Sequence, residues 1–335
     1  MNRTSRSVVV SRASLAAICV LLLPAILAAG QWPTFRGDVQ RSGVSDQALP
    51  LPLRAAWSYR PNQAPTPAWP EPAETNYAVM HNPLRQTLTF DRAFHVVADA
   101  QSVYFGSSAD DSVRCLDLAT GELRWQFVTE GPIRLAPALH GGLVLAGSDD
   151  GFLYALDART GKLAWKYRAA ASDKRLPGNG RMISMWPIRC GIAVDDDQVF
   201  FAAGLFPNQG VFLCCLDART GKEIFKRPLD FAAQGTLLAD AERLFVATGR
   251  TAFRSCRRED GEPLLRHGSS DPWKKNLVGG STALVIDGHL ATGPSEDGQI
   301  HWFKVASKSP LLRGAVESVV VSGKGICLLG GGKLW

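Results

Sequence analysis

Four short segments of this 335-residue chain are variants of one sequence pattern. They are Cys115-Leu-Asp-Leu-Ala-Thr-Gly-Glu-Leu-Arg-Trp125, Ala155-Leu-Asp-Ala-Arg-Thr-Gly-Lys-Leu-Ala-Trp165, Cys215-Leu-Asp-Ala-Arg-Thr-Gly-Lys-Glu-Ile-Phe225 and the degenerate Ser255-Cys-Arg-Arg-Glu-Asp-Gly-Glu-Pro-Leu-Leu265. Their glycines, at 121, 161, 221 and 261, are 40, 60 and 40 residues apart. A repeat of roughly 40–45 residues that is filled with short strands predicts a β-propeller.

The second repeat indicates how one blade is built. Apolar runs at 135–139, 143–147 and 152–156 are separated by glycine-containing turns, and a strand with charged residues follows at 162–167. Nearly continuous apolar runs are expected for strands buried on both faces, and charges suit an exposed sheet edge. Asp150-Gly151 between two apolar runs is a strong hairpin signal. Four antiparallel strands in about 40 residues therefore form one blade.

The same pattern marks the other blades and gives the fold class. Blades are expected at 94–128, 133–169, 188–229, 235–266 and 281–317, and a sixth begins at Val319. We therefore predict an all-β protein, a β-propeller of four-stranded antiparallel blades with about five complete blades and part of a sixth. Because the sixth blade stops at Trp335, the ring is expected to be incomplete. Residues 31–335 would form this one domain, with insertions at about 61–83 and 171–187.

Residues 1–30 have the three-part pattern of a secretory signal peptide. A basic start is followed by an almost unbroken apolar run from Ala13 to Ala29, and small residues precede Gln31. The mature protein is therefore expected to be exported, and to be periplasmic or secreted. An uncleaved leader would be its only membrane contact. Lipidation at Cys19 is disfavoured by the bulky Ile18 before it.

The charge pattern argues against nucleic acid as a partner. Removing the three arginines of the leader lowers the formal net charge from +6 to +3, and this excess is spread along the chain. The tightest basic cluster, Arg254, Arg257 and Arg258, is interpreted as a solvated strand end.

The cysteines and acidic pairs are interpreted structurally. Cys115, Ala155 and Cys215 share one repeat position, so that position accepts any small buried residue. No Cys/His spacing suits zinc. The acidic runs at 110–111, 149–150 and 195–197 are interpreted as turn residues, because Asp side chains cap backbone N–H groups. No metal site is predicted.

The pattern Ala155-x-Asp157-x-x-Thr160-Gly161-Lys162-x-x-Trp165 resembles the tryptophan-docking motif of the pyrroloquinoline-quinone (PQQ) propellers. In that family the tryptophan packs between blades, and the aspartate and threonine hold the turn. The resemblance implies structural docking roles for Trp125, Trp165, Phe225, Asp117, Asp157, Asp217, Thr120, Thr160, Thr220, Gly121, Gly161 and Gly221. Leu265 replaces the aromatic residue in the fourth repeat.

Two N-terminal segments extend the resemblance. Trp32-Pro-Thr-Phe-Arg-Gly37 is similar to the segment that precedes the propeller in many secreted bacterial members. Residues 53–59 resemble the N-terminal strand that completes the last blade of such rings, with Trp57 at the docking position. The family includes quinone-dependent dehydrogenases, a lipoprotein of outer-membrane barrel assembly and propellers without known activity, so fold alone does not fix function.

A dehydrogenase of this family would need PQQ, a Ca²⁺ ion beside it and a catalytic aspartate. Many members also carry a disulfide between adjacent cysteines, which draws attention to Cys214-Cys215. That pair lies in a predicted strand, where successive side chains point to opposite faces, so a bond between them is disfavoured. The sequence also lacks Gly-x-Ser-x-Gly, His-Glu-x-x-His and a complete phosphate-binding loop. We predict no catalytic residue and no cofactor.

We therefore predict a non-catalytic, exported propeller that binds a protein, peptide or glycan on its axial face. Loops on a rigid scaffold carry function more often than the scaffold does, and aromatic and arginine residues dominate binding surfaces. The candidate contacts are Trp69, Tyr77, Arg181, Met185 and Trp186. A PQQ- and calcium-dependent dehydrogenase is the first alternative. The second is an outer-membrane assembly factor that uses sheet edges for β-augmentation.

Overall fold

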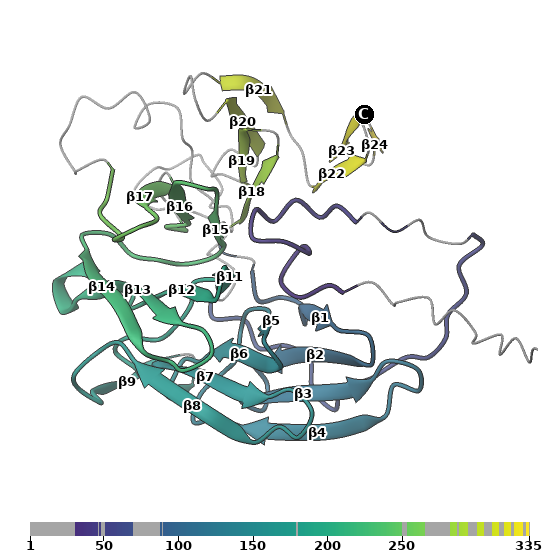
Figure 1. Ribbon diagram of the computed structural model, residues 1–335, viewed down its shortest axis with the longest axis horizontal. Coiled ribbons are helices and arrows are strands. Elements are labelled where there is room, and N and C mark those ends of the chain that lie inside the picture. Colours follow the sequence, from purple (N-terminus) through teal and green to yellow (C-terminus); the bar gives the residue numbers. More distant parts are fainter. Residues whose placement is uncertain are drawn as a thin grey trace, which may run out of the picture.

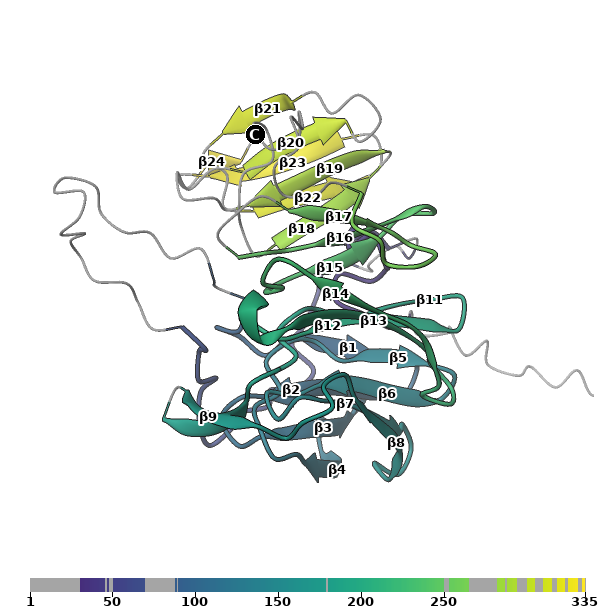
Figure 2. The same cartoon turned by 90° about the vertical axis from the view of Figure 1, so that its left-hand side faces the viewer.

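The computed structural model describes residues 31–45, 47, 51–69, 88, 90–178, 180–249 and 253–264, and shorter stretches between 282 and 334. Its strands form successive antiparallel sheets, stacked face to face along the chain (Figure 1, Figure 2). Among these residues the helical structure is one 3-10 turn, Pro207–Gln209, and no helix is long and apolar enough to cross a lipid bilayer.

Three sheets of four strands come first. The first contains β1 (Val96–Ala98), β2 (Ser102–Ser107), β3 (Ser112–Asp117) and β4 (Leu123–Val128). The second contains β5 (Ala138–His140), β6 (Leu143–Gly147), β7 (Phe152–Asp157) and β8 (Leu163–Arg168). The third contains β11 (Ala193–Asp195), β12 (Gln198–Ala203), β13 (Val211–Asp217) and β14 (Glu223–Leu229). A separate hairpin, β9 (Arg175–Gly178) and β10 (Arg181–Ser184), lies between the second and third sheets in the sequence.

Three further sheets follow. The fourth contains β15 (Leu237–Ala239), β16 (Arg243–Val246) and β17 (Arg254–Arg257). The fifth contains β18 (Thr282–Ile286), β19 (His289–Gly293), β20 (Ile300–Lys304) and β21 (Pro310–Gly314), and the sixth contains β22 (Ser318–Ser322), β23 (Gly325–Gly330) and β24 (Lys333–Leu334). The predicted all-β fold of four-stranded antiparallel blades is thus confirmed. The fourth sheet differs, since its described part has three strands and a single bridge between Cys256 and Pro263. Leu265 lies outside the described residues.

The first strands of neighbouring sheets lie against one another, β1 with β5, β5 with β11, β11 with β15 and β15 with β18. Figure 1 shows these inner strands toward the middle of the ring and β4, β8 and β14 at its periphery. We call the end of the blades with the Asp-x-x-Thr-Gly turns the lower end. The other end, where one sheet connects to the next, is the upper end.

The hydrophobic core is divided into layers between successive sheets. β2 and β3 of the first sheet pack with β6 and β7 of the second through side chains such as Val113 and Tyr154. Adjacent residues of a strand serve different layers, as alternation in a strand requires. Cys214 faces the second sheet and Cys215 faces the fourth. Because the two thiols belong to opposite layers, they are not placed to bond to each other.

The repeated turn fixes the contact between sheets. Asp157 Oδ1 accepts hydrogen bonds from the backbone N–H and hydroxyl of Thr160, and Gly161 has φ +70°. A Cβ atom at Gly161 would lie 2.7 Å from Cδ2 of Trp125, so the glycine allows the indole of the preceding sheet to approach the turn. Trp125 Nε1 also donates to Ala158 O at 2.9 Å.

The same contact recurs around the ring. Trp165 packs on Gly221, and Phe225 packs on Gly261. The turns at 117–121 and 217–221 have the same hydrogen bonds from Thr N–H to Asp Oδ1. Hydrogen bonds from Arg124 and from turn amides lower the pKa of Asp117 to about 2.

Trp57 extends this series at its N-terminal end. Its indole packs on Gly121 and donates to Leu118 O at 2.9 Å. The surrounding residues 53–59, however, form no strand, which corrects the sequence interpretation. A fourth strand needs a third strand beside it, and the described residues place none there.

The N-terminal segment 32–41 crosses the ring along the inner strands. Its backbone groups bond to β1 at Ala98, to β5 at Leu139, to β15 at Ala239 and to β18 at Val285. The buried guanidinium of Arg41 donates to backbone carbonyls that include Leu237 O at 3.1 Å, and burial lowers its pKa to about 10. This segment, which we call the axial plug, therefore fills the lower part of the axis with the protein's own chain.

The buried thiols are expected to be unreactive in the folded protein. Five cysteines, at 115, 190, 214, 215 and 256, are free and buried. Burial raises the pKa of Cys190, Cys215 and Cys256 to about 12, and the reactive form is the thiolate. Iodoacetamide at pH 8 should leave all five unlabelled, and the same treatment in guanidinium chloride should label all five. Peptide mass spectrometry distinguishes these results, and native labelling of Cys214 or Cys215 would contradict the layered core.

Candidate functional site at the upper end of the axis

A buried ion cluster lies at the upper end of the axis. Arg134 precedes β5, and its Nε donates to Asp149 Oδ2 at 2.7 Å while its Nη1 contacts Asp91 Oδ2 at 2.9 Å. Arg189 precedes β11 and donates to both oxygens of Asp149, at 2.9 and 2.8 Å. All four side chains are at most 2% exposed. We call these residues the axial ion cluster, and their two positive and two negative charges balance.

Equivalent positions of three blades supply side chains to this place. In each of these sheets the side chain comes from the residue six positions before the start of the first hairpin turn. The pairs are Arg134 and His140, Arg189 and Asp195, and Gln234 and Asp240. Because the inner strands converge on the axis, this one repeat position brings all three polar side chains together. Burial at such a point is tolerated when charges are paired and hydrogen-bonded.

Trp69, one of the predicted contacts, lies at this site. Its Nε1 donates to Gln234 Oε1 at 2.9 Å, and the Arg189 guanidinium lies 6.0 Å from its ring centroid. The sequence therefore indicated one member of the site without its partners. Tyr77, the other predicted contact of the 61–83 insertion, lies outside the described residues.

The remaining predicted contacts lie on the β9–β10 insertion at the same end of the blades. Arg181 forms an ion pair with Asp111 and donates to Ala109 O at 2.9 Å, which ties the hairpin to the first sheet. Trp186 Nε1 donates to Gln209 O at 2.8 Å in the β12–β13 loop. Met185 is half-buried. The structure thus joins Trp186 to a loop of the third sheet, whereas Arg181 and Trp69 make their contacts elsewhere.

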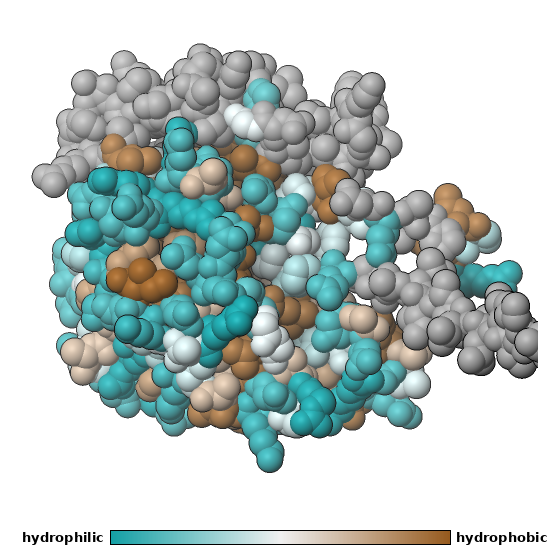
Figure 3. Space-filling model, in the orientation of Figure 1, coloured by the Kyte–Doolittle hydropathy of each residue, from teal (hydrophilic) through white to brown (hydrophobic). Residues whose placement is uncertain are grey.

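Two apolar side chains are exposed beside these residues. Met182 on β10 is 54% exposed, and Phe206, which precedes the 3-10 turn contacted by Trp186, is 45% exposed. Figure 3 shows hydrophobic residues interspersed with hydrophilic ones over the described surface in that view. The upper end therefore offers separate apolar side chains on loops that are held by hydrogen bonds and ion pairs.

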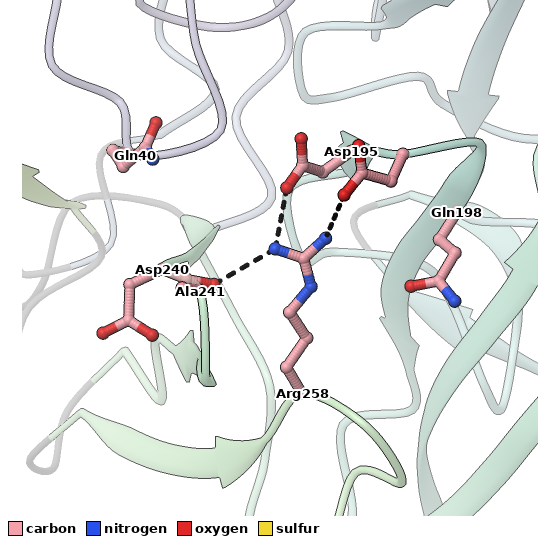
Figure 4. Close-up of a pocket in the computed structure, with 7 residues that line it drawn as sticks. Gln40, Asp195, Gln198, Asp240, Ala241 and Arg258 are labelled. Atoms are coloured by element: carbon pink, nitrogen blue, oxygen red, sulfur yellow. Dashed lines mark hydrogen bonds and ion pairs between the residues drawn. The ribbon is translucent and has the colours of Figure 1, made fainter.

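An open pocket of about 530 Å³ lies at the lower end, between the turns of the third and fourth sheets. Arg258 Nη1 contacts Asp195 Oδ2 at 2.7 Å and Asp240 O at 3.2 Å, so it bridges the two sheets (Figure 4). Its side chain is 15% exposed. The basic cluster predicted to be solvated therefore contains one arginine that connects blades, and this pocket's central charge is already matched.

The described axial residues do not fit a calcium and quinone site. Calcium takes roughly six to eight oxygen ligands, which include carboxylates that are available to bind it. Here guanidinium groups already occupy Asp149 and one oxygen of Asp91, and Asp91 Oδ1 is a buried oxygen without a partner among the described residues. No group of three or more His, Cys, Asp or Glu side chains in the described part of the chain could hold a metal ion.

Comparison with known proteins supplies the family. A profile described as "Outer membrane protein assembly factor BamB" matches residues 79–186 and 184–335, which together make up most of the chain. The chain belongs to this family. The BamB of Yersinia pestis is 24% identical over 247 residues, which cover 62% of this chain and 60% of the relative. The chain thus spans less than two thirds of that relative's length.

Other similar proteins share the family's propeller. The 1-butanol dehydrogenase (quinone) of Thauera butanivorans is 29% identical over 132 residues, which cover 39% of this chain and 18% of that enzyme. The solved structure of quinohemoprotein alcohol dehydrogenase ADHIIG from Pseudomonas putida HK5 superposes with a TM-score of 0.53 at 16% identity. It covers 87% of this chain and 48% of the other. This likeness shows the PQQ-type propeller fold alone.

Sequence reasoning missed the axial ion cluster. Asp149 belongs to a run interpreted as turn chemistry, and its neighbour Asp150 does accept a turn hydrogen bond from Phe152 N–H at 2.9 Å. Asp149 instead is buried under two arginines. A usable signal was present, because Pro-Ile-Arg occurs twice, at 132–134 and 187–189, immediately before two inner strands.

Proposed function

We propose that the protein is a non-catalytic propeller that binds a protein partner in the cell envelope, in the manner of an outer-membrane assembly factor. The family description and the similarity to the Yersinia protein support this proposal. The leader-like residues 1–30 support a location outside the cytoplasm. Because the chain spans only part of its relatives, an outer-membrane assembly component as the partner is part of this proposal.

The observation that carries the proposal is the exposure of two apolar side chains at the upper end, Met182 on the β9–β10 hairpin and Phe206 in the β12–β13 loop. Methionine and aromatic side chains are enriched at protein interfaces, and a surface held in place before binding loses less entropy on binding. Arg181 and Trp186 hold these loops through the contacts described above. The partner would accordingly bury the upper end of the blades at the β9–β10 hairpin and the β12–β13 loop.

A cross-linking pull-down from the envelope fraction tests this role. The wild-type chain should recover an outer-membrane assembly component, and the variant Met182→Asp/Phe206→Asp should recover at least tenfold less, because charges would be buried in the interface. Leu123→Asp/Ile224→Asp is the matched control. It adds the same two charges at apolar residues that are 52% and 49% exposed near the lower end, and its recovery should equal that of the wild type. Recovery of no assembly component by the wild type, or equal loss in the control, would refute the proposal.

A quinone-dependent dehydrogenase is the second candidate, because a quinone-dependent enzyme matches 39% of the chain. Purified protein incubated with PQQ and calcium should develop no bound-quinone absorbance and no dye-linked alcohol oxidation if the binding role is right. The axial ion cluster supports this expectation, since its carboxylates already accept from arginines. Alcohol oxidation that depends on both additions would replace the binding role with catalysis.

A further inference from the structure

Residues 64–69 lie across the upper end of the axis without belonging to any sheet. We call this segment, Ala64-Pro-Thr-Pro-Ala-Trp69, the strap. Thr66 N donates to Ser108 Oγ at 2.9 Å, and Thr66 O accepts from Arg134 Nη1 at 2.7 Å. The backbone N–H and C=O of Thr66 are thus both bound by side chains, and these side chains come from two different blades.

The next contacts follow two and three residues later. Ala68 N donates to Asp91 Oδ2 at 2.6 Å. The Trp69 indole donates to Gln234 and lies beside the Arg189 guanidinium. The strap is therefore held by side chains that bind its backbone at alternate residues and by one aromatic anchor, all at a buried polar site.

This is how a protein binds an extended peptide from another chain. Backbone hydrogen bonds supply affinity and a side-chain site supplies specificity. Prolines at 65 and 67 favour an extended backbone in advance, which lowers the entropy cost of binding. We propose that the upper end of the axis is a recognition site for an extended, proline-containing peptide with a tryptophan anchor, and that the strap occupies this site within the same chain. The inference rests on the proposed binding role and assigns it a second site.

The strap leaves this site incompletely satisfied. Asp91 Oδ1 is buried and lacks a hydrogen-bond partner among the described residues, although Oδ2 of the same carboxylate binds both Ala68 and Arg134. A buried carboxylate oxygen without a donor is unfavourable. A partner peptide with an additional donor at this point would therefore satisfy the site better than the strap does.

Release of the strap leaves the blades intact. Its neighbours Asn62 and Gln63 and its own Pro67 are exposed, and no strand pairing includes the strap. The arginines would retain Asp149 as their common partner. The site can therefore exchange its occupant while the interblade layers remain packed.

The experiment uses the purified full chain and a fluorescein-labelled peptide of residues 61–69, Pro-Asn-Gln-Ala-Pro-Thr-Pro-Ala-Trp. In the wild type the strap competes at the high effective concentration of a tethered ligand, roughly millimolar. Trp69→Ala removes the anchor of the strap, so fluorescence anisotropy should show at least tenfold tighter peptide binding to this variant. Adding Gln234→Ala should then weaken binding about tenfold, because the peptide's indole loses its acceptor.

The matched control is the same peptide with its tryptophan replaced by alanine, which should bind neither protein. Peptide binding that is equal in the Trp69→Ala and Trp69→Ala/Gln234→Ala proteins would overturn the proposal, as would no binding to either. Loss of cooperative unfolding in Trp69→Ala would also overturn it, since the strap would then be part of the core. A failed peptide assay beside a successful envelope pull-down would remove this site and leave the proposed function standing.

Hydrogen exchange tests the same point without any substitution. In the wild type, the amides of Thr66 and Ala68 should exchange at least 100-fold faster than those of Leu145 and Leu153 in the second sheet, because opening the strap does not require blade unfolding. Equal protection of the two sets would contradict an exchangeable strap.

Discussion

Asp149→Asn should lower the free energy of unfolding by about 3–5 kcal/mol, the usual range when one partner of a buried ion pair is removed. Asp149 is the common acceptor for Arg134 and Arg189, and its side chain has no exposed surface. The substitution keeps the shape of the side chain but leaves two buried guanidinium groups with one carboxylate. Urea unfolding followed by circular dichroism measures the loss.

A matched pair of variants checks the cause. Asp110→Asn alters an aspartate in the corresponding turn of the first sheet whose side chain is 38% exposed, and it should cost less than about 1 kcal/mol. Asp149→Asn combined with Arg189→Met should recover part of the loss, because one unpaired charge disappears. Equal stability of Asp149→Asn and the wild type would show that the axial ion cluster contributes nothing to folding.

Trp125→Ala should lower the free energy of unfolding by about 3–5 kcal/mol, which is typical of removing a buried tryptophan. The Trp125 side chain packs on Gly161 of the next sheet, donates to Ala158 O and lies 5.9 Å from the Tyr104 ring. Its loss leaves a cavity between two blades. The same urea titration, read by circular dichroism because the fluorophore changes, reports the effect.

Two substitutions on the same strand serve as controls. Leu123→Ala removes a 52% exposed side chain and should change stability by less than about 0.5 kcal/mol. Trp125→Phe keeps an aromatic ring at the position, as Phe225 does naturally, and should cost about 1 kcal/mol for the lost hydrogen bond. If Trp125→Ala lowered the free energy of unfolding by less than about 1 kcal/mol, the effect would be close to that of a surface substitution. The repeated docking contact would then not be what joins the blades.

Local patterns made the blades predictable from the sequence. The Asp-x-x-Thr-Gly turn and the aromatic residue four positions later are set by neighbours in the chain, so Trp125 and Trp165 occupy equivalent places in successive sheets as the repeat implied. The strand expected at 53–59 was wrong because pairing depends on another strand, which the local pattern does not report.

The site was less accessible to sequence reasoning for a physical reason. The members of the axial ion cluster come from separate segments, at 91, 134, 149 and 189, and they meet only because the inner strands converge. The path of the axial plug through the ring was not predicted, for a different reason, although residues 32–37 stood out by their resemblance to a family segment. Its partners are mainly backbone groups, which leave no mark on side-chain composition. Arg258 likewise looked solvated because its acceptor lies on the neighbouring sheet.

The axial plug also affects the order in which the protein can fold. This segment is synthesised before every blade, yet Leu237 O, which accepts a hydrogen bond from Arg41, lies 196 residues further along the chain. Contacts so distant in sequence slow folding, because much chain must be ordered before they form. The plug can meet β1 and β5 as soon as the first two sheets form, but its contacts with Leu237, Ala239 and Val285 must wait for the fourth and fifth sheets.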